Sequence, residues 1–526
     1  MRQSWQSSTT STRLVLALTW SLAILFLINA LWFVLRASNP VIQADEWYYL
    51  DVFVRKAIEG NLHGVDFFAK RSADDHAQPL FKLILLLEWR YFDLDYVVGA
   101  VFGVAAAAGC ALIFHRVLIH QRRPGEAGSS VSRLAWTAIC ALLFSLGSVG
   151  MWVWPLVVLE NITIFVILLF MLAVWRAHRS RRYLLLVVAT LALGISSDDS
   201  ALIAVIAASL GMLLALWADP EQRHPSAWKI LAIVVTCEVL VRIGYAYLPG
   251  APTSHGHALA PLLGVLIERI KEGGWWQWIL LPLVLPVYYQ NPLPPANAPV
   301  WLFAQVLVGV LLLLAHVLFW RRALRGRYSL PVFMAVCMML LSYGWVAGVI
   351  LWRVSALGND YLQQPRYVLL YADQLIALLL MWGGSHELRC EATKSMRQPA
   401  APWQTVQTRV AVAAALVLLL VQVPQSIQAW RMPRYEWIYY AKQAAEIDAI
   451  ARDPVHAQEC DLVNPVCAAS PEVRRGLTQL LSAKRLNIYS PRLQRWYPRL
   501  PALMPAPVLP VLSVDKPASD REKQKD

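Results

Sequence analysis

Long apolar runs alternate with short polar stretches along the whole chain. A run of about 17 to 25 apolar residues is long enough to cross the hydrocarbon core of a bilayer as an α-helix. Runs bounded by Arg and Lys, or by Pro and Gly, are Leu14–Leu35, Leu94–Ile119, Leu134–Met151, Pro155–Trp175, Tyr183–Ile195, Ala201–Trp217, Ile230–Tyr247, Val300–Trp320, Tyr328–Leu351, Tyr367–Trp382 and Val410–Val423. The pattern predicts an all-α polytopic membrane protein with about 11 transmembrane helices.

The basic residues test this reading, because Lys and Arg collect in cytoplasmic loops of membrane proteins. With the N-terminus in the cytoplasm, the cytoplasmic loops are His120–Arg133, Arg176–Arg182, Asp219–Lys229, Arg321–Arg327 and Gly383–Arg409, and each contains more than one Lys or Arg. The opposite turns, Trp152–Trp154 and Ser196–Ser200, contain none. The pattern predicts a cytoplasmic N-terminus and an external C-terminus.

Composition agrees with this class. The chain is 58% hydrophobic and 15% charged, which is far from the composition of a soluble globular protein. A net charge of +13 would point to nucleic acid in a soluble protein. Here much of the Lys and Arg lies in short loops between apolar runs, so we expect contact with the lipid bilayer and no nucleic-acid partner.

Two further segments fit no simple span. Pro79–Phe92, within the first external loop (37–93), is short and contains charged residues, so it predicts an amphipathic helix at the membrane interface. The external loop 248–299 is rich in proline and aromatic residues, and its Ile279–Val287 run could enter the membrane without crossing it.

The composition changes after the last apolar run. Residues 1–430 form the predicted membrane domain, whereas residues 431–500 are rich in charge and predict a small external C-terminal domain. Tyr435–Ala451 has helical spacing of its apolar residues. A unit of this size is near the lower limit for a core of its own, so we expect it to dock onto the membrane domain. The Pro-rich and then charged composition of residues 501–526 predicts that this tail is disordered.

Two cysteines differ from the other five. Cys460 and Cys467 lie close together in the polar C-terminal region, which the charge pattern places outside the cell membrane. Their spacing does not fit a zinc site, but it suits a local disulfide in an oxidising compartment. We therefore predict that they are linked to each other.

The densest group of charges in the membrane domain lies between Asn39 and Lys82. An acidic pair, Asp45 and Glu46, follows the first predicted helix directly, where acidic groups are costly unless they have a function. A carboxylate here could act as a general base. The alternative is a solvated loop in which the pair caps a helix or forms salt bridges to Lys56 or Arg71.

The spacing around this pair resembles the first external loop of the C-type glycosyltransferase superfamily. The resemblance rests on the acidic pair, Tyr48–Tyr49, Ala57–Gly60 and Gln78–Leu80, and on a later element, Gln364–Leu370. That superfamily includes the lipid A aminoarabinose transferase and the protein O-mannosyltransferases. Many members have Lys-Pro-Pro where this chain has Ala-Gln-Pro, and a proline after the Arg-Tyr pair that is absent here. The resemblance is thus to the superfamily rather than to one of its families.

The resemblance implies an inverting transferase of the bacterial inner membrane, with a C-type fold. Its donor would be a sugar on polyprenyl phosphate, and its acceptor an external glycan, lipid or protein. Asp45 would be the catalytic base, with Glu46 as a substitute, or the two could bind a divalent metal ion. The sequence contains no P-loop or Rossmann glycine motif, which favours a lipid-linked donor over a nucleotide sugar.

A departing phosphate requires cations. Arg366, beside Tyr367 at the external start of an apolar run, is the strongest candidate, because a guanidinium binds phosphate oxygens through two parallel hydrogen bonds. Lys82, His76 and Arg353 are weaker candidates. The alternative for Arg366 is an anchor at the membrane interface.

Three further acids, Glu160, Asp198 and Asp199, lie at the ends of predicted helices. Glu160 could orient the acceptor, or all three could have structural roles. They could instead form the ion pathway of a transporter or lipid flippase, although such proteins usually contain repeated halves that we do not find here. An O-antigen ligase or polymerase is a lesser alternative, since those enzymes use Arg and His in a large late loop.

Overall fold

The computed structural model describes residues 2–70, 77–119, 130–197, 199–247, 259–289, 299–396, 402–431, 433–453 and 471–497, and every regular element in these ranges is helical. The long helices are α1 (Arg2–Ala37), α5 (Val97–Ile119), α6 (Ser130–Leu143), α9 (Glu160–Ser180), α10 (Tyr183–Ser197), α11 (Asp199–Ala218), α12 (Ser226–Tyr247), α15 (Pro299–Arg325), α16 (Leu330–Val349), α18 (Pro365–Met396) and α19 (Pro402–Arg431). The prediction of an all-α protein is confirmed for the described residues.

Nine helices in the described ranges are long and apolar enough to cross a membrane. They include α8 (Pro155–Val158) joined to α9, and α16 continued through a π-helical turn, η4 (Ile350–Val354), and α17 (Ser355–Leu357). The two remaining predicted spans form shorter apolar helices, α6 and α10. The fold is that of a multi-pass membrane protein.

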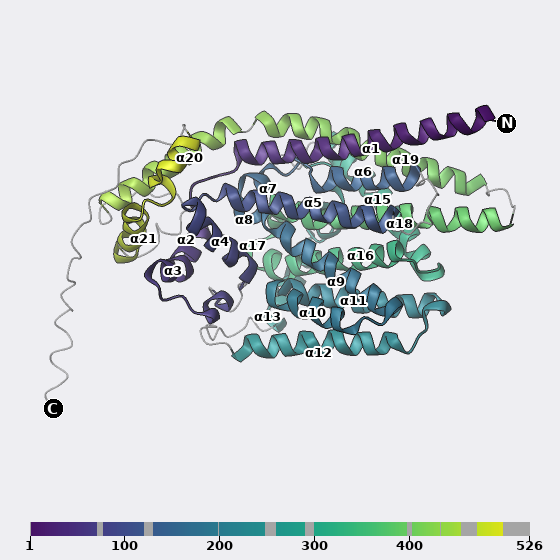
Figure 1. The fold of residues 1–526 in the computed structure, drawn as a ribbon, viewed down its shortest axis with the longest axis horizontal. Helices are drawn as coiled ribbons and strands as arrows, with labels where there is room; N and C mark the ends of the chain where they lie inside the picture. The colour runs from purple at the N-terminus through teal and green to yellow at the C-terminus, as the bar shows by residue number, and fades with distance from the viewer. Residues whose placement is uncertain are drawn as a thin grey trace.

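The long helices run side by side in one bundle (Figure 1). We call the end of the bundle at which α1 ends, at Ala37, the distal end. Helices of the first external loop and of the C-terminal region gather there, together with α7: α2 (Glu46–Tyr49), α3 (Arg55–Glu59), α4 (Pro79–Phe92), α7 (Val149–Val153), α20 (Pro433–Arg452) and α21 (Pro471–Ala483). The N-terminus lies at the opposite end (Figure 1).

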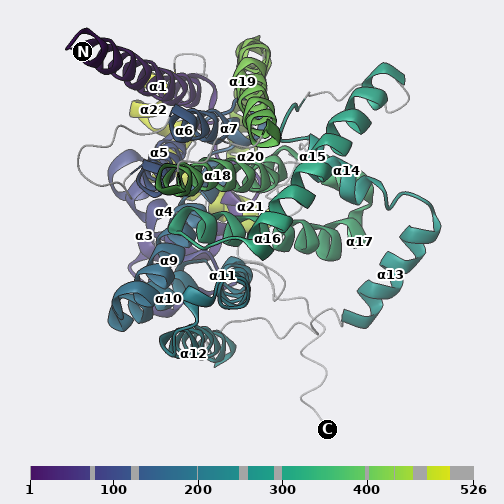
Figure 2. The same cartoon turned by 90° about the vertical axis from the view of Figure 1, so that its right-hand side faces the viewer.

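Helix α18 forms the centre of the bundle. Its span is 83% buried, whereas α1 and α15 are each only 17% buried. Figure 2 looks along the bundle and shows α18 surrounded by other helices, with α12 and α15 at the periphery. An apolar helix that remains exposed in the folded chain is suited to face lipid, so α1, α12 and α15 present the lipid-facing surface.

One predicted helix is interrupted. The run Leu134–Met151 was expected to form a single span, but α6 ends at Leu143 and a new short helix, α7, begins at Val149. Between them the Trp152 indole donates to the Ser145 carbonyl (2.6 Å), and Gly147 lies so close to Gln425 that a Cβ would be 2.8 Å from its side chain. The turn therefore depends on a contact with α19.

Helix α4 has the bounds that the sequence predicts, but two of its three charged side chains lie on its buried face, and Arg90 alone is exposed. Lys82 and Glu88 are 0% and 1% exposed, whereas Leu83 is 48% exposed. The buried face packs against the first external loop and the C-terminal helices. Pro79 begins the helix at a position where its missing N–H has no cost.

The loop 248–299 is also partly helical. It contains α13 (Leu259–Lys271) and α14 (Gln277–Val284), and Leu281 and Leu285 pack against α18.

The stretch Gly383–Arg409 was predicted to be a loop, but α18 continues to Met396 and α19 begins at Pro402. Residues such as Glu, Leu, Arg, Ala and Lys, which favour helices, extend α18 past its apolar part.

The C-terminal helices dock against the first external loop. Helices α20 and α21 and a 3₁₀ turn, η7 (Asn487–Tyr489), share an apolar cluster with residues 41–96, and α22 (Pro491–Trp496) follows η7. The expected helix at Tyr435–Ala451 lies within α20. The tail 501–526 and the pair Cys460 and Cys467 lie outside the described residues, so their predictions stand as stated.

We expect Gly103→Ala to destabilise the protein by about 1–3 kcal/mol, because overpacking a tight contact forces backbone shifts. A Cβ at Gly103 would lie 2.3 Å from the Val158 carbonyl oxygen, where α5 crosses α8. Thermal unfolding of the purified protein would measure the loss. The matched control is Gly348→Ala, whose Cβ would meet no atom within 4 Å and which should leave stability unchanged or slightly raised.

Candidate functional site

The acidic pair lies in a tight turn between α1 and α2. Glu46 closes this turn in both directions: its amide donates to the Gln43 carbonyl (3.0 Å), and its Oε2 accepts from the Gln43 amide (2.8 Å). Ala44, between them, has a φ of 44°, in the left-handed region that side chains with a Cβ rarely adopt. The turn is strained, and it places Asp45 next in the chain with a partly exposed side chain.

Glu46, expected as a substitute base, is fully buried. Burial raises the pKa of Glu46 well above its usual value, and the charge of Asp45 adds to this effect. Burial and the charge of Glu46 likewise raise the pKa of Glu88 on α4. Burial thus shifts both carboxyl groups towards their neutral form, and Asp45 is the partly exposed member of the acidic pair.

Three buried polar atoms face this region without a partner among the described residues. They are Glu46 Oε1, Glu88 Oε2 and the hydroxyl of Tyr96. Glu88 Oε1 accepts from the Gly99 amide (2.7 Å), which ties α4 to the start of α5. An unsatisfied buried polar atom costs about 1–3 kcal/mol, so this group makes the region sensitive to protonation.

Lys82, expected to contact the donor phosphate, has a different set of contacts. Its ammonium donates to the carbonyls of Asp66 (3.0 Å), Phe67 (3.0 Å) and Ala69 (2.6 Å), and its side chain is fully buried. An ammonium group has three hydrogens to donate, and these carbonyls are among its partners. Lys82 thus holds the 64–70 segment in place. His76 lies outside the described residues.

Arg366 is held at the first turn of α18 by aromatic side chains. Its Nη2 donates to the Tyr361 hydroxyl, and its Cζ lies 5.5 Å from the Tyr361 ring centroid and 5.1 Å from that of Tyr367. Within the described part of the chain, its Nε has no hydrogen-bond partner. Arg353 is exposed on η4 and close enough to Tyr367 to interact with it electrostatically. The predicted phosphate-binding arginines therefore share one neighbourhood around Tyr367.

The short helix α7 connects the two halves of the predicted site. The backbone amide of Asn39, just after α1, donates to the Val153 carbonyl (2.9 Å). At the other end of α7, the Ser148 hydroxyl donates to the Pro365 carbonyl (2.7 Å), directly before Arg366. The acidic turn and the start of α18 thus lie at the same end of the bundle, the distal end.

Both π-helical turns in the described residues adjoin predicted site residues. The first, η1 (Leu50–Val54), continues α2 directly after the acidic pair, and the second, η4, contains Arg353. A π-turn inserts one extra residue into a helix and redirects its side chains, and such turns are frequent at functional sites. This signal is independent of the residue types.

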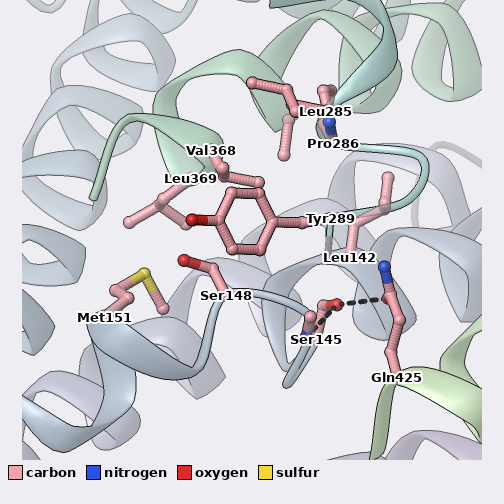
Figure 3. Close-up of a pocket in the computed structure, with 12 residues that line it drawn as sticks. Leu142, Ser145, Ser148, Met151, Leu285, Pro286, Tyr289, Val368, Leu369 and Gln425 are labelled. Carbon is pink, nitrogen blue, oxygen red and sulfur yellow. Dashed lines mark hydrogen bonds between the residues drawn. The ribbon is translucent and has the colours of Figure 1, made fainter. Parts of the chain in front are cut away.

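A small cavity borders the start of α18. Its volume is about 20 Å³, and Ser145, Ser148, Tyr289 and Gln425 contribute its polar groups (Figure 3). The Tyr289 hydroxyl donates to the Gln363 carbonyl (3.1 Å), and Ser145 donates to Gln425 (3.2 Å). Arg366 does not line this cavity. The cavity wall therefore fixes the segment that leads into Arg366.

The two other predicted acids that the structure describes, Glu160 and Asp199, lie at the starts of helices. Glu160 is the first residue of α9 and is partly buried. Asp199 begins α11, and Asp198 lies outside the described residues. Among the described side chains, no group of three His, Cys, Asp or Glu is placed to hold a metal ion.

Sequence reasoning missed Glu88, Tyr96 and Asn487. A signal for Glu88 was present: Phe81, Ile84, Leu85 and Glu88 follow the i, i+3, i+4, i+7 spacing of a buried helical face. No local pattern marks Asn487, because its contacts come from residues more than 390 positions away.

Comparisons with known proteins give no assignment. No family model matches this chain, and no curated protein sequence matches it.

We expect Glu88→Gln to stabilise the protein increasingly as the pH rises above about 4.5, the usual Glu pKa. A raised pKa in the folded state means that wild-type stability is greatest below that pH and is lost as the pH rises through the folded-state pKa, by about 1.4 kcal/mol per pH unit. Glutamine keeps the acceptor for Gly99 and cannot ionise.

Thermal unfolding of both proteins between pH 4.5 and 8 would measure this difference. Glu59→Gln, an exposed glutamate on α3, is the control and should follow the wild type. A constant difference between Glu88→Gln and wild type over the whole range would contradict the burial argument.

Proposed function

We propose that this protein is an inverting glycosyltransferase of the bacterial inner membrane. It would move a sugar from a polyprenyl-phosphate donor to an external glycan, lipid or protein acceptor, at the distal end of the bundle. The N-terminus would lie in the cytoplasm and the C-terminus in the periplasm. The resemblance of residues 39–82 and Gln364–Leu370 to the C-type superfamily motivates the proposal, and no comparison assigns a family.

The arrangement around Arg366 supports this proposal most directly. Its guanidinium is fixed between two tyrosines at the end of a central membrane helix, and within the described residues its contacts include no carboxylate. A fixed cation without a counter-ion is preorganised for an anion. At the end of a membrane helix, a lipid phosphate is the anion that a guanidinium is best placed to meet.

Asp45 supplies the second requirement of the reaction. The acceptor oxygen would attack the anomeric carbon while its proton passes to the Asp45 carboxylate. The bond between that carbon and the phosphate oxygen would break, and the phosphate would leave with the electron pair. The charge developing on the phosphate would be stabilised by Arg366, with Arg353 nearby. Attack from the side opposite the leaving group inverts the anomeric centre.

We expect Asp45→Asn to lower turnover by about 10²–10⁴-fold with folding intact, because the amide keeps the shape of the side chain but cannot accept the proton. Asp51→Asn, in the following π-turn, is the matched control for a nearby acid. Transfer by purified protein would be followed by mass spectrometry of the acceptor. Turnover above about a tenth of wild type would rule out Asp45 as the base.

For Arg366 we expect turnover to fall in the order Arg, Lys, Ala, with thermal stability little changed. Lysine keeps the charge but loses the planar pair of donors, and alanine loses both. Arg327→Ala, an exposed arginine paired with Glu221 at 3.5 Å, is the control and should leave turnover unchanged. Equal activity of all three Arg366 variants would make this residue an interfacial anchor.

The donor must be tested as well as the residues. Transfer should require a polyprenyl-phosphate sugar and should fail with the nucleotide sugar alone. Mass spectrometry of envelope glycans from cells with and without the gene would identify the sugar and the acceptor.

Transport of an ion, a solute or a lipid is the alternative function, and one observation favours it. Asp373 lies inside the α18 span, is 1% exposed, and its Oδ2 has no partner among the described residues. An ionisable side chain within a membrane span is often functional. Ion-coupled flux in proteoliposomes, with no glycosyl product from any donor, would favour transport over transfer.

A further inference from the structure

The C-terminal helices contact the first external loop through one buried asparagine. Asn487 is 0% exposed, and it lies in η7 between α21 and α22. Its Oδ1 accepts from the Ile42 amide (3.1 Å), and its Nδ2 donates to the carbonyls of Pro40 (2.8 Å) and Leu94 (2.7 Å). Its own amide donates to the Asp93 carbonyl (2.7 Å). One residue thus makes four hydrogen bonds to two separate parts of the chain.

These two parts are the ends of the segment that carries the acidic turn. Pro40 and Ile42 lie directly before Asp45, and Asp93 and Leu94 lie between α4 and α5. Asn487 therefore joins the entry of this segment to its exit. Backbone groups buried here have no access to water, so each needs such a partner.

The backbone at this junction is strained on both sides. Asp93 has a φ of 55°, Leu94 of 62° and Asn487 of 49°. A left-handed conformation costs a residue such as leucine roughly 1–2 kcal/mol and persists only where surrounding contacts enforce it. The hydrogen bonds from Asn487 to the carbonyls of Asp93 and Leu94 enforce this conformation. Asparagine itself tolerates a left-handed backbone well.

Further contacts surround Asn487 and lock the same two parts. The side-chain amide of Asn39 donates to the side-chain oxygen of Gln443 on α20 (3.2 Å), and the Tyr440 hydroxyl donates to the Ala37 carbonyl (3.1 Å). On the exit side, the Ser490 hydroxyl donates to Asp93 (2.8 Å), and the Tyr497 hydroxyl to Asp95 (3.0 Å). The C-terminal helices are thus a clamp on the ends of the first loop rather than a separate appendage.

We propose that Asn487 is a positioning residue, which sets the Pro40–Glu46 turn and thereby the location of Asp45. The link to catalysis rests on the proposed function, whereas the clamp itself does not. Two hydrogen bonds hold the turn. The Gln43 amide donates to the Glu46 carboxyl group, and the Ile42 amide donates to the Asn487 side chain. Loss of Asn487 frees one side, and the strained Ala44 can then relax and move Asp45.

The test compares Asn487→Gly and Asn487→Asp with wild type in the full-length protein. Glycine adopts a positive φ without strain, so Asn487→Gly removes the side-chain bonds while leaving the backbone conformation accessible. Aspartate keeps an acceptor for the Ile42 amide but sets a buried carboxylate oxygen against the Pro40 and Leu94 carbonyls. It is the harsher variant, and Asn487→Gly carries the test if Asn487→Asp does not fold. The control is Tyr489→Phe, which removes a buried hydrogen bond to Asp448 (3.0 Å) inside the clamp itself.

The first readout is amide hydrogen exchange of peptides covering residues 38–50 in detergent or nanodiscs. We expect exchange of the Ile42 amide to accelerate at least about tenfold in Asn487→Gly and at least as much in Asn487→Asp, with the α16 core unchanged. Tyr489→Phe should leave this peptide as in wild type. Unchanged exchange at Ile42 in both Asn487 variants would overturn the clamp, and this outcome does not depend on the activity of the protein.

The second readout is transfer from a polyprenyl-phosphate sugar. We expect kcat to fall about 10- to 100-fold in Asn487→Gly with the KM for the donor unchanged, because misplacing a catalytic group by about 1 Å has a cost of this order. Faster exchange at Ile42 with unchanged kcat would overturn the positioning role. If wild type transfers no sugar while exchange responds as expected, the clamp stands and the proposed function fails.

Discussion

Lipid offers no hydrogen-bond partner to a peptide group, and this constraint governs the architecture of the protein. Within the described residues, each apolar run satisfies its backbone as a helix. The non-helical backbone near the predicted site lies at the distal end, at the 38–45 turn, the 144–148 turn and the segment before α18. At each of these places side chains replace the missing helical bonds: Asn487 and Glu46 in the first, Ser145 in the second, and Ser148 and Tyr289 in the third.

This distribution concentrates both strain and buried polar groups where the predicted chemistry lies. Ala44 and Leu94 have left-handed backbones, and Glu46 and Glu88 are buried acids that each have one oxygen without a partner among the described residues. Each of these features lowers stability unless neighbouring contacts enforce it. A protein that keeps several of them within one small region holds it in one conformation, which is what a preorganised site requires.

Much of the fold could be predicted from local patterns. Pro79–Phe92 was predicted with its observed bounds, because proline marks the start of a helix and the apolar spacing marks its length. The break after Leu143 could not be predicted, since it depends on Gln425, which is far away in sequence. The site was only partly accessible: residue types identified Asp45 and Arg366 as candidates, but the burial of Glu46 and the bonds of Lys82 to three carbonyls arise from tertiary packing.

The contacts of Asn487 also bear on how the chain is made. A ribosome synthesises Pro40–Glu46 early and Asn487 only after α19 and α20, so the strained turn has to wait for its partner while the membrane helices are inserted. During that interval the exit of the first segment at Leu94 also lacks its enforcing bond. The acidic turn is therefore among the last parts of the molecule to acquire its final conformation, although it is among the first to be translated.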